Sequence, residues 1–104
     1  MVIIFSNEYA REYLLEHGMV YSFRTGSLRK QLGKDWMTDR RTAPKISDVF
    51  IEAVEEIKPE SLFMRLNQYH KQSGFFSTDE WIATITSLSN WDLDDGWLYK
   101  VSLR

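Results

Sequence analysis

Cations that could bind phosphate groups concentrate in one stretch of the chain. Between residues 24 and 45 there are seven cations and two acids, which gives this basic segment a net charge of about +5. The rest of the chain holds six cations and thirteen acids, or about −7, and the sum is −2. The cations of the basic segment are Arg24, Arg29, Lys30, Lys34, Arg40, Arg41 and Lys45. Such a local excess of charge indicates a phosphate-bearing partner.

Arginine and tryptophan within the basic segment favour a nucleic acid. Arg40 and Arg41 are adjacent, and a guanidinium can bind phosphate through two hydrogen bonds. Trp36 lies among the cations and offers a surface on which a base can stack, although it can equally anchor the segment to the core. The alternative is a solvated loop that keeps an acidic protein soluble. With a sequence pI of about 5.6, we expect a compact site for structured RNA or a single extruded nucleotide.

The strand predicted over residues 19–24 ends at the basic segment and carries a second candidate group. Its alternation places Tyr21 and Phe23 on one face, and Val20, Ser22 and Arg24 on the other. We expect the first face to be core and the second to be functional or solvent-exposed. Ser22 and Arg24 would then form a hydroxyl and guanidinium pair in a cleft.

The composition excludes several classes of function. Without cysteine the chain has no disulfide, no thiolate zinc site and no nucleophilic thiol. Its two histidines lack the spacing of a zinc helix and no phosphate-binding glycine loop is present, so we expect neither a metal nor a cofactor. No apolar run approaches the roughly 20 residues of a membrane span, and no signal peptide precedes the domain. We therefore expect a cytoplasmic protein without membrane association.

The pattern of apolar residues and helix caps predicts one α+β domain over residues 1–104. A domain of this size forms one core. Gly18 ends the first predicted helix and Ser77 begins the last in a capping box. Helices are expected over residues 7–17, 59–73 and 78–88, and strands over 2–5, 19–24, 49–57 (a central strand) and 97–103, with a long, partly ordered loop over 25–44.

Three short segments, in this order, resemble the ASCH family of PUA-like small β-barrels, in particular its short archaeal members. They are Tyr21-Ser22-Phe23-Arg24, then Gly33-Lys34-Asp35-Trp36, then residues 45–51 with the sequence KISDVFI. Residues 73–81 and 96–101 continue the likeness, which spans about 19–103. The resemblance implies a mixed barrel with flanking helices and an RNA-binding cleft at the strand that contains Ser22 and Arg24.

One bacterial branch of that family is an amidohydrolase acting on acetylcytidine, with a catalytic Lys and Thr. Ser22 falls at the position of that Thr, but Met19 falls at the position of the Lys. A methionine can neither act as a base nor supply a charge. The branch also takes a carboxylate from the following strand, for which Glu52, Glu55 and Glu56 all remain candidates.

We therefore expect recognition of RNA or a modified nucleotide without catalysis. The residues assigned to it are Ser22, Arg24, Arg29, Lys30, Lys34, Trp36, Arg40, Arg41 and Lys45. Two alternatives remain: an amidohydrolase on a modified nucleoside, and an adaptor that binds a protein through its acidic faces.

Overall fold

The computed structural model describes residues 2–40, 43–88 and 94–104 of the chain. In chain order its elements are β1 (Val2–Ile4), α1 (Glu8–His17), β2 (Met19–Thr25), β3 (Gly33–Thr38), β4 (Ser47–Ile57), α2 (Leu62–Tyr69), α3 (Thr78–Leu88) and β5 (Gly96–Leu103), with 3-10 turns at Pro59–Ser61 and His70–Gln72. The described segments confirm the predicted α+β class. None of their helices has the length and apolar character needed to cross a membrane.

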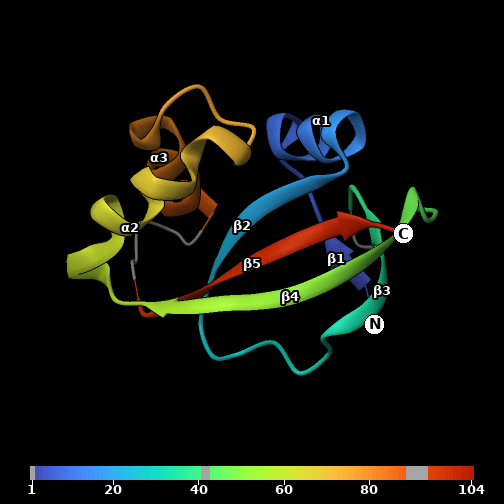
Figure 1. The fold of residues 1–104 in the computed structure, drawn as a ribbon, viewed down its shortest axis with the longest axis horizontal. Helices are drawn as coiled ribbons and strands as arrows, with labels where there is room; N and C mark the ends of the chain where they lie inside the picture. Colours follow the sequence, from blue (N-terminus) through green and yellow to red (C-terminus); the bar gives the residue numbers. More distant parts are fainter. Residues whose placement is uncertain (1, 41–42, 89–93) are drawn as a thin grey trace.

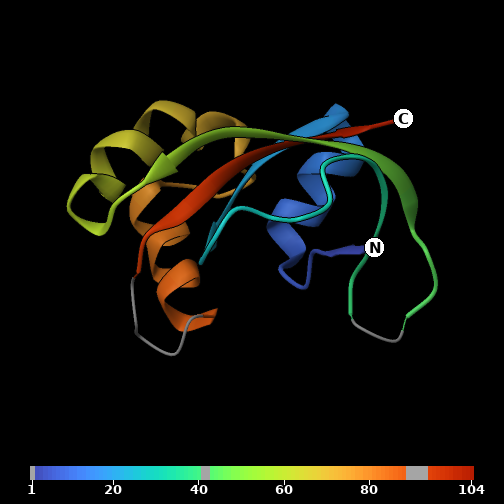
Figure 2. The same cartoon turned by 90° about the horizontal axis from the view of Figure 1, so that it is seen from below.

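The five strands form a single sheet in the order β1-β3-β4-β5-β2. Only the pairing of β1 with β3 is parallel, and the other three pairings are antiparallel. The sheet curls into a half-barrel, with α1 near one end and α2 and α3 near the other (Figures 1 and 2). Because β4 has two strands on one side and two on the other, the prediction of a central strand is confirmed.

Hydrophobic side chains pack on both faces of the sheet. Val20 of β2 is paired with Val101 of β5, and both belong to a core shared with α1. Phe23, paired with Leu98, belongs to a second core shared with α2 and α3. Since alternate residues of a strand point to opposite faces, the two cores lie on opposite sides of β2.

This two-sided packing corrects the expectation for β2. Val20 and Ser22 are buried, at 0% and 8% exposure, although they lie on the face that we expected to be functional or solvent-exposed. The alternation was read correctly, but a single strand does not reveal that helices cover both of its faces.

A bulge in β4 allows that strand to contribute to both cores. Its pairing with β5 runs regularly up to Ala53, then shifts so that Glu55 is opposite Leu98. Val54 is therefore an extra residue in the ladder. Ile51 belongs to the core with α1, whereas Ile57 belongs to the core with α2 and α3.

Local signals at the helix ends act as predicted. The side chain of Asn7 accepts hydrogen bonds from the backbone N–H groups of Tyr9 and Ala10 and caps α1. Gly18 ends α1 in the left-handed conformation, with φ of 84°. The Ser77 hydroxyl accepts a hydrogen bond from the Glu80 N–H at the start of α3. Each cap satisfies backbone groups that a helix end leaves without partners.

The prediction of a loop over residues 25–44 is wrong in its middle, where β3 lies. β3 pairs with β1 on one side and with β4 on the other. Its sequence shows no clean alternation, because Met37 and Thr38 are consecutive and both are completely buried. The partner strands, distant in sequence, therefore determine this strand.

Candidate functional site

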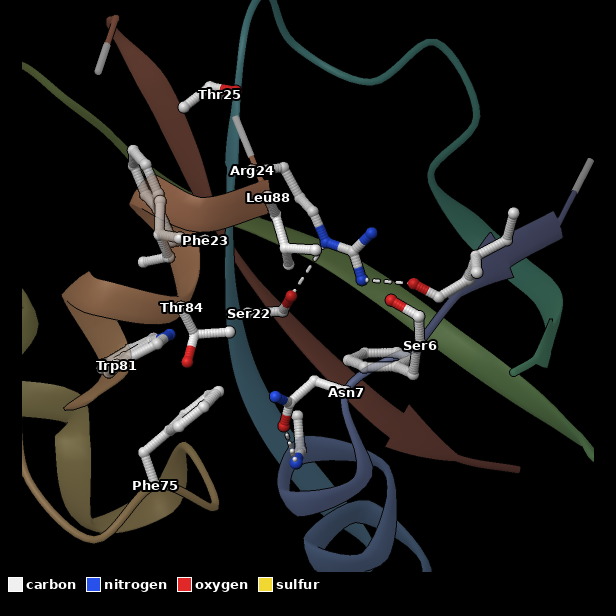
Figure 3. Close-up of a pocket in the computed structure, with 14 residues that line it drawn as sticks. Ser6, Asn7, Ser22, Phe23, Arg24, Thr25, Phe75, Trp81, Thr84 and Leu88 are labelled. Atoms are coloured by element: carbon white, nitrogen blue, oxygen red, sulfur yellow. Dashed lines mark hydrogen bonds between the residues drawn. The ribbon is translucent and has the colours of Figure 1, made fainter. Parts of the chain in front are cut away.

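A pocket of about 340 Å³ opens beside β2, where α1 from one face of the sheet approaches α3 from the other. Figure 3 shows Ser22, Phe23, Arg24 and Thr25 on β2, with Ser6 and Asn7 at the start of α1. The opposite wall is formed by Phe75 and by α3 residues. This volume is typical of a site for a small molecule or a single base.

The side chain of Arg24 lies at the polar end of the pocket and joins the two edge strands of the sheet. Its Nε donates a hydrogen bond to the Ser22 hydroxyl at 3.0 Å, and its Nη2 donates to the carbonyl oxygen of Ile4 in β1 at 2.9 Å. The guanidinium also lies over the ring of Phe5, 5.0 Å from the ring centroid. Its Nη1 makes no hydrogen bond within residues 2–40, 43–88 and 94–104. That nitrogen is thus available to a ligand.

The charge of Arg24 is not neutralised by the described part of the chain. Burial lowers the pKa of Arg24 to about 10, and the positive charge of Arg29 acts in the same direction, opposed by Tyr99. None of the described carboxylates forms an ion pair with Arg24. A buried cation without a carboxylate favours a ligand that brings negative charge or strong hydrogen-bond acceptors.

The first turn of α1 adds hydrogen-bond donors beside Arg24. Capping holds the Oδ1 atom of Asn7 against the backbone of α1, which directs its side-chain amide nitrogen into the pocket (Figure 3). The Ser6 hydroxyl points toward the Arg24 guanidinium in the same view. The positive end of the helix dipole lies there as well. The polar end of the pocket is thus electropositive.

Aromatic side chains form the apolar end. The rings of Phe75 and Trp81 are nearly parallel, with 11° between their planes and 6.3 Å between their centroids. Phe75 is positioned by Gly74, where a Cβ atom would lie 2.5 Å from the backbone oxygen of Tyr9, so only glycine allows the chain to pass this close to α1. Together with Phe23, these rings offer flat surfaces for a planar ligand.

Arg29 lies in a different environment. Its Nη2 donates to Asp35 at 2.8 Å and to the carbonyl oxygen of Val2 at 3.0 Å, and its backbone N–H donates to the Tyr99 hydroxyl at 2.7 Å. The Asp35 side chain is only 1% exposed. Arg29 therefore holds β1 and β3 together, and its guanidinium is already occupied by protein groups. It does not line the pocket.

The other residues assigned to RNA binding are spread around the sheet. Lys30, Lys34, Arg40 and Lys45 are exposed, and Lys45 forms a surface ion pair with Asp48 at 3.1 Å. Trp36 is half-buried on β3 and opposite Asp48. Arg41 lies outside the described residues. Of the nine assigned residues, the structure brings Ser22 and Arg24 together in the pocket.

Sequence reasoning missed the aromatic wall and the contribution of α1. Phe75 and Trp81 were interpreted only as packing residues, and Asn7 only as a helix cap. The cap itself carried a usable signal, since an asparagine whose oxygen caps a helix must turn its amide nitrogen outward.

The pocket lacks the groups that hydrolysis would require. Apart from Arg24, the side chains that line it are apolar, hydroxyl or amide groups. Met19 is outside the lining, and Glu55 is held on the other side of the sheet by Arg65, which donates to both of its carboxylate oxygens at 2.6 and 2.7 Å. The arrangement supports binding and offers no general base for catalysis.

Comparison of the chain with protein-family models, curated proteins and solved structures found no match.

Proposed function

We propose that the chain is a small PUA-like domain, of the ASCH kind that its sequence resembles, and that it recognises a nucleotide of RNA. The pocket takes one base between its aromatic wall and Arg24. The exposed cations of the basic segment contact neighbouring phosphates. The mechanism is recognition, and no bond is made or broken.

One observation carries this proposal: the Arg24 guanidinium, without an ion-pair partner in the described chain, faces a pocket with an aromatic wall. Flat rings suit a nucleobase, and a cation at the other end suits its carbonyl groups or an adjoining phosphate. The volume of about 340 Å³ admits a single base rather than a duplex. An extruded or unpaired nucleotide is therefore the ligand that fits best.

A pair of phenylalanine substitutions in α3 tests the proposal. Thr84 lines the pocket, whereas Ala83 is an exposed neighbour that does not. We expect Thr84→Phe to fill the pocket and to weaken binding of labelled single-stranded or transfer RNA at least tenfold in fluorescence anisotropy. Ala83→Phe, which adds the same ring to the same helix, should bind as the wild type does.

Equal binding by both variants and the wild type would show that RNA does not use the pocket. If the wild type binds no RNA even at low salt, the proposal fails, and the protein-adaptor hypothesis is to be tested next. Melting temperatures of the two variants serve as the folding control.

A further inference from the structure

Hydrogen-bond donors outnumber free acceptors at the polar end of the pocket. Three donors are unoccupied: Nη1 of Arg24, the amide nitrogen of Asn7 and the hydroxyl hydrogen of Ser22. The Ser22 hydrogen is free because the Ser22 oxygen already accepts from Arg24. A ligand group at this end therefore encounters donors from β2 and from α1.

The backbone acceptors nearby are already bonded to arginines. The carbonyl oxygen of Ile4 accepts from Arg24 at 2.9 Å. Those of Phe5 and Ser6 accept from Nη1 of Arg11 at 3.1 and 3.5 Å. The two arginines thus bind the carbonyl groups of the β1–α1 connection and leave its side-chain donors to the ligand. The hydroxyl groups of Ser6 and Thr25 can donate or accept, so they do not discriminate.

We propose that the pocket selects bases that present a carbonyl oxygen, such as uracil and hypoxanthine, over the matching bases that present an amino group, cytosine and adenine. The proposal rests on the proposed function, because it concerns the same pocket. A carbonyl oxygen accepts from Arg24 and Asn7 together. An amino group in that position would face two donors and leave all three groups unpaired, which is costly in a desolvated site. The ring N–H beside the carbonyl can donate to a hydroxyl oxygen of Ser6.

Two pairs of mononucleotides isolate this feature. Uridine and cytidine 5′-monophosphates form one pair, and inosine and adenosine 5′-monophosphates form the other. Each pair differs by a carbonyl against an amino group and by the ring nitrogen next to it. In isothermal titration calorimetry at low salt, we expect the carbonyl member of each pair to bind at least about tenfold more tightly, as expected for one well-formed pair of hydrogen bonds.

Asn7→Asp tests the donor directly. Aspartate caps helices as well as asparagine does, so α1 is retained, while the side-chain donor becomes an acceptor. We expect the ratio of the two dissociation constants in each pair to fall toward one, or to invert. Asn67→Asp provides the matched control, because Asn67 lies on α2, outside the pocket, and accepts from Thr78 through Oδ1. Its ratio should equal that of the wild type.

The outcomes separate the inference from the proposed function. Equal affinity within each pair, with Thr84→Phe still abolishing binding, would overturn the inference and leave nucleotide recognition standing. Tighter binding of the amino members would also overturn it. Failure of all four mononucleotides to bind, together with no effect of Thr84→Phe on RNA binding, would remove both.

Discussion

Arg24 and Arg29 perform the same structural task in neighbouring regions, but only one of them has its charge neutralised. Both reach β1, where Arg24 donates to the carbonyl oxygen of Ile4 and Arg29 to that of Val2. Arg29 also pairs with the buried carboxylate of Asp35, whereas Arg24 has only neutral partners among the described residues. Fastening an edge strand accounts for the hydrogen bonds of both side chains. It does not account for the charge of Arg24, which is why we assign that charge to a ligand.

The largest effect is expected from breaking the neutralised site. Asp35→Ala would leave Arg29 with an unpaired charge and remove the hydrogen bond that Asp35 accepts from the Trp36 N–H at 2.8 Å. Loss of one partner from a buried ion pair typically costs about 3–5 kcal/mol of unfolding free energy. Chemical denaturation measures it. Asp48→Ala, which breaks a surface pair with Lys45, should change stability by less than about 1 kcal/mol. A similar cost in both variants would contradict the contrast.

Substitution of each arginine by methionine sharpens the comparison. Arg29→Met strands Asp35 and should cost about 3 kcal/mol or more. Arg24→Met removes a buried charge along with its hydrogen bonds, so we expect a smaller loss, about 1–2 kcal/mol, and complete loss of RNA binding. Denaturation and anisotropy measured on the same samples check both. A greater loss of stability for Arg24→Met than for Arg29→Met would mean that the charge of Arg24 is compensated within the protein.

The exposed cations should give a more modest effect, limited to the salt dependence of RNA binding. For single strands, each phosphate contact contributes about 0.7 to the slope of log affinity against log salt. Arg40→Ala/Arg41→Ala should therefore flatten the slope by about 1.4. The control is Lys58→Ala/Lys71→Ala, two exposed cations outside the basic segment. An unchanged slope in the first variant would restrict recognition to the pocket.

The smallest effect concerns the partly exposed ion pair between Glu55 and Arg65. A hydrogen bond from Arg65 holds the pKa of Glu55 below its usual value of 4.5. Since the pKa is lower in the folded protein, the stabilisation is present above pH 4.5 and is lost as the pH falls through the folded value. Thermal melts between about pH 3 and 7 should show wild type and Glu55→Gln converging at acidic pH. Parallel curves would contradict this.

The elements that the sequence predicted well are those with local causes. Asn7, Gly18 and Ser77 determine helix ends through bonds to residues nearby in sequence, and these ends were confirmed. β3 was missed because its partners lie in β1 and β4 and no alternation indicates them. Propensity cannot supply a pairing between distant segments.

The candidate site was partly predicted for the same reason. Arg24 and Ser22 were assigned to a cleft, and they line the pocket. That Arg29 would be occupied by Asp35 was not predictable from a count of charges, because their pairing depends on how the β2–β3 connection folds back. Phe75 and Trp81 enter the pocket through the approach of α3 to α1, which no local pattern encodes.

The bulge in β4 has a consequence for how the length of this strand can vary. Counted in frames of two residues, Val54 is a frameshift, since Ala53 faces the core with α1 while Glu55 and Leu98 face the opposite side. Deleting Val54 would restore a regular ladder without changing any pairing on either side of it, whereas deleting Ile51 would move half of the strand out of frame. A change of one residue is therefore tolerated at Val54, where it alters the curvature of the sheet and leaves both cores intact.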